Sequence, residues 1–371
     1  MTLLTSIDLF SGIGGITTAL HSFAKPVLYC EIDAAAQAVL KHAMSRRLLP
    51  RAPIHSDIQN LTAPPRADIV VAGIPCVGWS NFGNKRGLDN EQSGLFYRVL
   101  DVIDRCGATC FLFENVPLIM KDVDVLEREL CKKRKFVMRY TCVSASDVGA
   151  PHQRTRWYCL GYVPGSPITR MSVGGLGGGY KPYPWKHEAV PRTTTTPCTA
   201  SLQLLGNSVV PDAVRLAFLR LLDSSVDRLS ARKTSWKPLV GACKTPLLLS
   251  ASVCEVSTSL QHAWYPSPIV KCETDLKLVI DPAAIAPPAH TLAKLPALQS
   301  KVRMQRWSTP RRSCPGHVNV LTRRTVYDLA SQVRFEKGTK NRKRLLNPEF
   351  VEWMMGFPAG FTAAACTVQT R

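Results

Sequence analysis

Short apolar runs of strand type alternate with helical stretches throughout residues 1–165 of the chain. Strands are predicted at Ile7–Phe10, Val27–Glu31, Asp68–Ala72, Cys110–Glu114, Val137–Ser144 and Arg156–Tyr162. Between them, Leu95–Cys106 and Val123–Arg134 carry apolar residues at helical spacing. This alternation predicts βαβ units and an α/β fold with a doubly wound, mostly parallel sheet. Such folds bind ligands beyond the carboxyl ends of their strands.

Four further parts are expected after this core. Residues 166–205 read as a Gly/Pro/Thr-rich connection, with a flexible joint at Gly174–Gly179. Residues 206–228 hold an amphipathic helix over Val209–Leu222, which returns to the core. Residues 229–345 are predicted to form a smaller, basic domain, and residues 346–371 a supporting segment and tail.

The charge of the chain suits a polyanionic partner. The sequence has 371 residues with 47 Lys plus Arg against 27 Asp plus Glu, a net charge of +20. The stretch from Lys301 to Arg344 alone contains 13 basic residues and two acids. Basic residues that neutralise phosphates release counterions, so this distribution favours nucleic acid as the partner.

Cysteine spacing and hydropathy bear on the compartment. The 13 cysteines are scattered without a CxxC pair, so neither a zinc site nor a disulfide framework is expected. Buried, reduced cysteines in an intracellular compartment (cytoplasm or nucleus) are the prediction. No apolar stretch of membrane-spanning length occurs, and polar residues interrupt the N-terminus as no signal peptide would. We therefore expect a protein that is not secreted, binds neither membrane nor metal, and is monomeric.

Residues at the ends of two predicted strands, together with Asp57, form a candidate cofactor site. Asp8–Gly15 is a strand end, a Gly-rich turn and a helix start, in which Phe10, Gly12 and Gly14 let the backbone approach a ligand. Glu31, beside Ile32, ends the next strand and is placed to accept ribose hydroxyls. Asp57, beside Ile58, is a candidate acceptor for an adenine amino group. A plain strand–helix turn and a helix N-cap at Asp57 are the structural alternatives.

A second group of residues carries the chemistry of a covalent catalyst. Cys76 follows Pro75 in a loop that leaves a predicted strand, where a stiff backbone can hold an exposed thiol as a nucleophile. A buried structural cysteine is the commoner alternative. Glu114 ends another strand, and Arg154 and Arg156 lead into the last one. Strand positions two apart share a face, so the two arginines are expected to point at one site.

Together these segments resemble the DNA (cytosine-5)-methyltransferase family. The resemblance rests on Asp8–Gly15, Pro75-Cys76, Glu114–Val116 and the Arg154/Arg156 pair, on Gly206–Pro211, and on Leu346–Pro358. It implies a Rossmann-like fold that binds S-adenosylmethionine, with Asn207, Ser208 and Val209 in the late cofactor motif. It further implies that Leu346–Pro358 supports a target-recognition domain. Several such motifs in one chain are far more specific than any single one.

Two features depart from the family pattern. The recognition region and its supporting segment usually precede the Gly-Asn-Ser motif, whereas here they follow Gly206–Ser208. We interpret this as a permuted chain order with the same chemistry. The second departure is His152, where many members carry Gln, which affects one supporting hydrogen bond.

The resemblance implies methyl transfer to carbon 5 of cytosine in duplex DNA. Cys76 would add to C6 of a flipped-out base, Glu114 would stabilise the protonated ring, Arg156 would hold O2 and Arg154 would support the loop. Two alternatives stay open. One is the same chemistry on RNA cytosine, and the other is an inactive DNA-binding accessory protein. A basic α/β domain with chance motifs is the remaining alternative.

Overall fold

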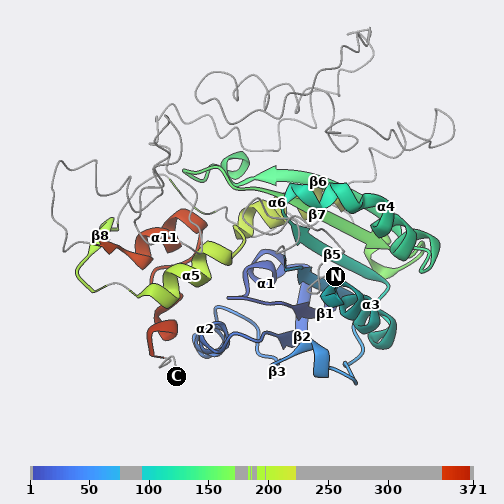
Figure 1. Cartoon of the computed structure of the whole chain (residues 1–371), viewed down its shortest axis with the longest axis horizontal. Coiled ribbons are helices and arrows are strands. Elements are labelled where there is room, and N and C mark those ends of the chain that lie inside the picture. The colour runs from blue at the N-terminus through green and yellow to red at the C-terminus, as the bar shows by residue number, and fades with distance from the viewer. Residues whose placement is uncertain are drawn as a thin grey trace, which may run out of the picture. The chain divides into compact units, whose positions relative to one another are not determined.

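A seven-stranded sheet organises the part of the chain that the structure describes (Figure 1). This computed structural model describes residues 3–75, 94–171, 183, 185, 190–196, 198–222 and 345–367. Its strands are β1 (Leu4–Leu9), β2 (Ala24–Cys30), β3 (Ile54–His55), β4 (Ile69–Gly73), β5 (Cys110–Asn115), β6 (Val137–Ser144) and β7 (Thr155–Tyr162). All the described residues belong to one compact unit.

The strand order is β3-β2-β1-β4-β5-β7-β6. The pairs from β3 through β5 are parallel, and β7 is antiparallel to both of its neighbours. The chain builds outward from β1 to β3 and then crosses back to β4, so the order reverses between β1 and β4. A ligand crevice is expected at this reversal, at the carboxyl ends of the strands.

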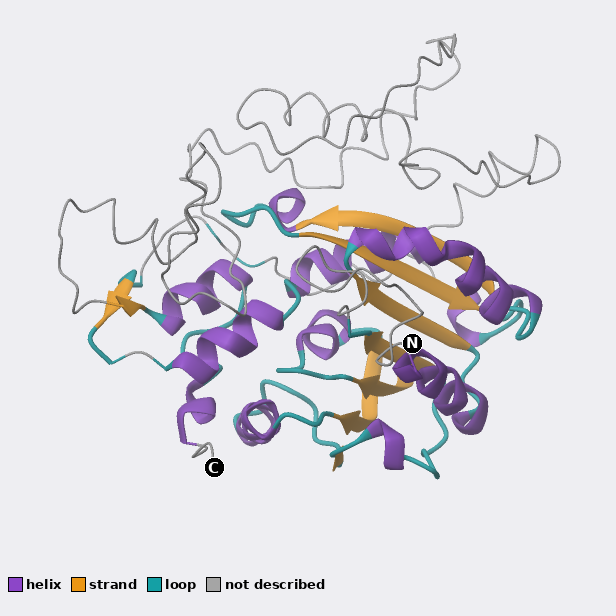
Figure 2. Ribbon diagram, in the orientation of Figure 1, coloured by secondary structure: helices purple, strands orange, loops and turns teal. Residues whose placement is uncertain are grey.

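Helices cover both faces of the sheet (Figures 1 and 2). They are α1 (Gly15–Leu20), α2 (Ala34–Ser45), α3 (Gly94–Cys106), α4 (Val123–Leu126), α5 (Thr199–Asn207), α6 (Pro211–Leu222) and α11 (Pro348–Met355). Short 3-10 turns lie at Ile58–Asn60, Pro117–Asp122, Ala145–Val148, Pro167–Arg170 and Ala363–Thr367, and a π-helical turn at Glu127–Lys132. Alternate residues of a strand face opposite ways, so Ile69 and Val71 pack with α1, α2 and α6, whereas Val70 and Ala72 pack with α3.

The C-terminal segment returns to this core. Strand β9 (Leu345–Leu346) pairs antiparallel with β8 (Thr193–Thr194), and Asn347 Nδ2 donates to the carbonyl of Pro191 at 2.7 Å. Helix α11 contacts α5, and the turn at Ala363–Thr367, labelled η10, contacts α2. Figure 2 shows α5 and α11 side by side. The expected supporting segment therefore packs on the catalytic core itself.

The structure confirms the α/β class and all six predicted strands, with bounds that differ by three residues or fewer. Within the connection at 166–205, the structure describes β8 and most of α5. Two expectations need correction. The predicted helix Val123–Arg134 is α-helical only to Leu126 and continues as the π-helical turn. A disulfide joins Cys198 and Cys366, although no disulfide framework was expected from the scattered cysteines.

Several expectations concern residues outside those described. The basic domain at 229–345 (except Leu345, in β9), the joint at Gly174–Gly179 and the nucleophile Cys76 lie there, so the domain boundaries stay predictions. No described helix combines the length and the apolar character required to cross a membrane.

Candidate active site

The turn between β1 and α1 is open toward a ligand. Phe10, Gly12 and Gly14 adopt positive φ angles of 53°, 53° and 84°. A Cβ built on Gly12 would meet nothing within 4 Å, so this side of the turn leaves room for a bound molecule. Ser11 stabilises the turn, since its hydroxyl donates to the carbonyl of Asp8 at 2.6 Å.

Asp8 lies fully buried beneath this turn. Its Oδ2 accepts a hydrogen bond from the Thr17 hydroxyl at 2.6 Å, and Oδ1 has no partner among the described residues. Burial raises the pKa of the Asp8 carboxyl to about 7, the Thr17 bond opposes the shift, and the nearby Glu31 charge adds to it. A carboxyl with such a pKa titrates near neutral pH.

Glu31 connects the turn to the end of β2. Its Oε2 accepts from the Gly12 amide at 2.7 Å, and its Oε1 accepts from the Asp33 amide at 2.8 Å. Burial raises the pKa of the Glu31 carboxyl. Each carboxylate oxygen has a second lone pair, so these bonds leave acceptor capacity for hydroxyl groups. Ile32 follows with 73% of its side chain exposed, an apolar surface next to that carboxylate.

The Asp57 and Ile58 side chains have structural roles. Asp57 caps the 3-10 turn Ile58–Asn60, and its Oδ1 accepts from the Gln59 amide at 2.9 Å. Ile58 is buried in the core. The capping alternative from the sequence is therefore observed, and an adenine contact by Asp57 stays a prediction.

The late motif lies against the early turn. A Cβ built on Gly15 would come 2.6 Å from Val209 Cγ2 and 3.3 Å from Ser208 Oγ, so only glycine permits this approach. Asn207, the last residue of α5, is exposed beside them. The fold thus joins two motifs that are far apart in the chain at the turn that follows β1.

Glu114 and Arg156 form an ion pair at the end of β5. Arg156 Nε lies 3.1 Å from Glu114 Oε1, with the side chains only 20% and 12% exposed. Burial raises the pKa of the Glu114 carboxyl, and the charges of Arg156 and Arg154 oppose that shift. A carboxyl held in this way can carry a proton or accept hydrogen bonds at the carboxyl end of β5.

The backbone that leads to Cys76 is hydrogen-bonded to Glu114 and Asn115. The Ile74 amide donates to the carbonyl of Glu114 at 3.2 Å, and Asn115 Nδ2 donates to the carbonyl of Ile74 at 3.4 Å. Pro75 follows, half-buried. Cys76 itself lies outside the described residues, but the chain enters it from a position fixed beside Glu114.

Arg154 has a different set of contacts from Arg156. Its guanidinium is buried, and its Nη2 donates to the carbonyls of Gly206 at 3.1 Å and Ser208 at 2.6 Å. This bond joins the start of β7 to the end of α5. The motif spacing predicted an arginine near the site, but its acceptors lie more than 50 residues away in sequence and follow only from the fold.

His152 is the one departure from the family motif that the structure describes. Its side chain is 1% exposed, and neither ring nitrogen has a hydrogen-bond partner among the described residues. Burial, with the charges of Arg154 and Arg156, lowers the pKa of its ring to about 3. The ring is therefore neutral at ordinary pH and adds no third positive charge beside the two arginines.

A family model described as C-5 cytosine-specific DNA methylase matches residues 4–371. The chain belongs to this family. As a DNA (cytosine-5)-methyltransferase it methylates cytosine in DNA and uses S-adenosylmethionine as the methyl donor. The resemblance inferred from the sequence motifs is confirmed.

Two curated relatives illustrate the extent of the similarity. The type II methyltransferase M.CviJI of Paramecium bursaria Chlorella virus IL3A is 26% identical over 375 residues, covering 95% of this chain and 96% of that protein. The type II methyltransferase M.HpaII of Haemophilus parainfluenzae is 29% identical over 178 residues, covering 45% of this chain and 48% of that protein. The chain thus spans nearly all of M.CviJI and about half the length of M.HpaII.

Solved methyltransferase structures are more distant. The S. pombe Dnmt2 methyltransferase has a TM-score of 0.37 with 21% identity, covering 51% of this chain and 59% of that chain. A putative DNA modification methyltransferase encoded in an E. coli prophage has a TM-score of 0.36 with 25% identity, covering 44% and 47% of the respective chains.

The residues at the carboxyl ends of β1 and β2 fit S-adenosylmethionine by their chemistry. The open turn at Gly12 leaves space at the backbone, Glu31 offers a carboxylate for hydroxyl groups, and the exposed Ile32 offers an apolar surface for a purine. Among the residues that the structure describes, no cluster of acidic, histidine or cysteine side chains is arranged to hold a metal ion.

Proposed function

We propose that this methyltransferase works on duplex DNA through a covalent adduct between Cys76 and a flipped-out cytosine. Carbon 5 of cytosine is a poor nucleophile, so the ring must first receive electrons. A Cys76 thiolate that adds to C6 makes C5 enamine-like. After methyl transfer, loss of the C5 proton and departure of the thiolate restore the aromatic ring.

Glu114 supplies the acid for that addition. Its carboxyl, with a pKa raised by burial, hydrogen-bonds N3 and the exocyclic amine of the base and stabilises the protonated ring during attack. The backbone bonds between Ile74 and the Glu114–Asn115 pair hold the entrance of the nucleophile loop beside the acid. Nucleophile and acid would then meet on one base.

The two arginines have different proposed roles. Arg156, paired with Glu114 at 3.1 Å, would orient that carboxyl and offset charge that develops on O2 of the base. Arg154 is a positioning residue, because its guanidinium binds the carbonyls of Gly206 and Ser208 instead of facing open space. It would fix the late motif relative to the acid.

The cofactor site is proposed at the β1–β4 reversal. Phe10, Gly12 and Gly14 line it from the turn, Glu31 binds the ribose, and Ile32, Asp57 and Ile58 surround the adenine. The remaining proposed cofactor-binding residues are Pro75, Asn207, Ser208 and Val209. S-adenosylmethionine, when bound, supplies an electrophilic methyl group on its sulfonium.

Base flipping is required because the reacting atoms of a stacked base are not accessible to the protein. Neither C6 nor N3 can reach Cys76 and Glu114 while the base is stacked in a duplex, so the nucleotide must leave the stack. The basic residues of 229–345 would hold the phosphate backbone and read the flanking bases. The single observation that carries the proposal is the half-buried Glu114–Arg156 pair, with the Glu114 carbonyl hydrogen-bonded to Ile74 just after β4.

The test compares Cys76→Ser with wild type and with Cys131→Ser, which changes a half-buried cysteine on the π-helical turn. Cys76→Ser should bind duplex DNA normally and transfer no labelled methyl group, because a hydroxyl is a weak nucleophile at neutral pH. Cys131→Ser should remain active. Full activity of Cys76→Ser would overturn the mechanism. Transfer to RNA but not to duplex DNA by wild type would favour the RNA alternative, and no transfer to either would favour an inactive accessory protein.

A further inference from the structure

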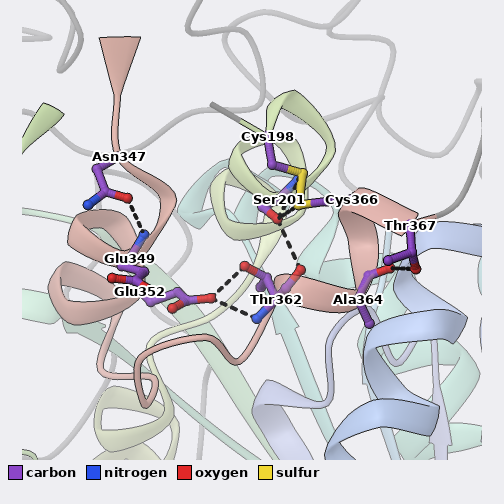
Figure 3. Close-up of a disulfide and its surroundings, with 9 residues drawn as sticks. All are labelled: Cys198, Ser201, Asn347, Glu349, Glu352, Thr362, Ala364, Cys366 and Thr367. Carbon is purple, nitrogen blue, oxygen red and sulfur yellow. Dashed lines mark hydrogen bonds between the residues drawn. A yellow bond between two sulfur atoms is a disulfide. The ribbon is translucent and has the colours of Figure 1, made fainter. Parts of the chain in front are cut away.

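The disulfide between Cys198 and Cys366 lies outside the methyl-transfer site (Figure 3). The two cysteines are 168 residues apart in sequence, and their Cα atoms are 5.7 Å apart, within the usual range for a disulfide. Cys366 is exposed and Cys198 half-buried, so small reagents can reach the pair. By contrast Cys30, Cys106, Cys110 and Cys159 are buried in the core.

The surroundings of the pair favour thiol chemistry. Cys198 is the N-cap of α5, where its sulfur accepts from the Ser201 amide at 3.5 Å and from the Ser201 hydroxyl at 3.2 Å. The same hydroxyl lies 3.4 Å from Cys366 Sγ and 3.0 Å from the carbonyl of Thr362, to which it can donate instead. Donors at a helix N-terminus stabilise negative charge on sulfur, and the thiolate is the form that reacts with disulfides.

Hydrogen bonds hold the backbone near both cysteines in place. Helix α5 ends at Asn207, and Arg154 holds the carbonyls on either side of that residue. On the other side, the buried Glu352 accepts from the Gly360 and Thr362 amides, each at 2.7 Å, and from the Thr362 hydroxyl at 2.6 Å. Non-covalent contacts therefore bring the two sulfurs together, so oxidation needs no large rearrangement.

We propose that Cys198 and Cys366 form a reversible redox site that stabilises the cofactor-binding end of the fold. The oxidant is a low-molecular-weight disulfide. The Cys198 thiolate attacks one of its sulfurs and releases one thiol. Cys366 then loses its proton, attacks the Cys198 sulfur and releases the second thiol. Two protein thiols and one reagent disulfide thus become one protein disulfide and two reagent thiols. The new bond ties the helix that ends in the late cofactor motif to the C-terminal segment.

The test equilibrates the full-length protein with oxidised or reduced glutathione, blocks free thiols, and identifies cross-linked peptides by mass spectrometry. A peptide pair joining Cys198 to Cys366 should form in oxidised glutathione and disappear in reduced glutathione. The oxidised protein should melt about 3–5 °C higher, because the bond closes a long loop in the unfolded chain. Methyl-transfer activity should also be lost more slowly on heating in the oxidised protein, for the same reason.

Matched variants separate this site from the other cysteines. Cys366→Ser and Cys198→Ser should each abolish the peptide pair and the rise in melting temperature, whereas Cys131→Ser should retain both. Ser201→Ala should form the pair several-fold more slowly. Absence of the pair from wild-type protein in fully oxidised glutathione would overturn the proposal even if a variant failed to fold. A melting-temperature rise that persists in Cys366→Ser would overturn it as well.

Discussion

Asp8 combines complete burial with a carboxyl pKa raised to about 7. The folded protein therefore holds a proton at pH values where the unfolded chain, near the ordinary pKa of 3.8, has released it. Between about pH 4 and pH 7 this carboxyl makes the folded state less stable as the pH rises, and the loss is complete above pH 7. Near pH 8 it should amount to about 4 kcal/mol, at about 1.4 kcal/mol for each unit of the shift from 3.8 to about 7.

The Asp8→Asn variant tests this directly, because an amide resembles the protonated acid in shape. The free energy of unfolding of wild type, minus that of the variant, should fall from pH 4 to pH 8 in urea titrations. Taking the difference removes the contributions of groups that do not interact with Asp8, such as His152. Asp124→Asn, which changes an exposed carboxylate, is the control variant measured beside it. A flat difference for Asp8→Asn would contradict the assignment.

Glu31 is the residue whose loss should weaken cofactor binding most simply. Glu31→Ala removes the proposed ribose acceptor and also the bond to the Gly12 amide that shapes the turn. The affinity for S-adenosylmethionine should fall by about 1–3 kcal/mol, the usual cost of leaving partnered polar groups unpaired. Isothermal titration calorimetry measures this change. An unchanged affinity would show that Glu31 serves only the fold.

At the scale of elements, the contact between β7 and α5 depends on Arg154. Arg154→Met leaves the carbonyls of Gly206 and Ser208 without this donor, so the late motif should lose its fixed position. We expect the KM for S-adenosylmethionine to rise more than the KM for DNA. Arg139→Met is a matched control, because Arg139 Nη1 donates to the carbonyl of Leu221 at the far end of α6, at 2.6 Å. Equal effects of the two variants on cofactor KM would refute the positioning role.

Strands were the easiest elements to predict, because buried parallel strands are continuous apolar runs bounded by polar turns. Helix α5 was not predicted, for both local and long-range reasons. It follows a Thr-rich stretch, its N-cap is Cys198, and Arg154 and α11 stabilise it from distant parts of the chain. Strand β3 has two residues and forms only by pairing with β2.

The positions of Glu31 and Glu114 at strand ends were predictable, because each comes at the end of an apolar run, and their roles stay proposals. The site was not predictable where partners come together only on folding. The approach of Val209 to Gly15 and the pairing of Cys198 with Cys366 both depend on the return of distant segments to the core. Sequence spacing holds no signal for either contact.

For the whole molecule, the division between chemistry and DNA binding predicts a salt effect. The stretch from Lys301 to Arg344 holds 13 basic residues, and it lies outside the described residues. Reversing Arg311→Glu together with Arg312→Glu should weaken DNA binding and reduce the slope of log affinity against log salt by about 0.9 for each lost phosphate contact. Cofactor affinity should not change. An unaltered salt slope would mean that DNA recognition lies elsewhere in the chain.

The most direct test of the covalent mechanism is trapping on duplex DNA that carries 5-fluorocytosine at the methylated position. Fluorine cannot leave as a proton does, so the thiol adduct should persist after methyl transfer. Mass spectrometry of the wild-type protein, incubated with this DNA and S-adenosylmethionine, should find the methylated nucleotide attached to the peptide that contains Cys76. Cys76→Ser should give no adduct. Wild-type protein that methylates ordinary cytosine but forms no adduct with 5-fluorocytosine, or forms it at another residue, would contradict the mechanism.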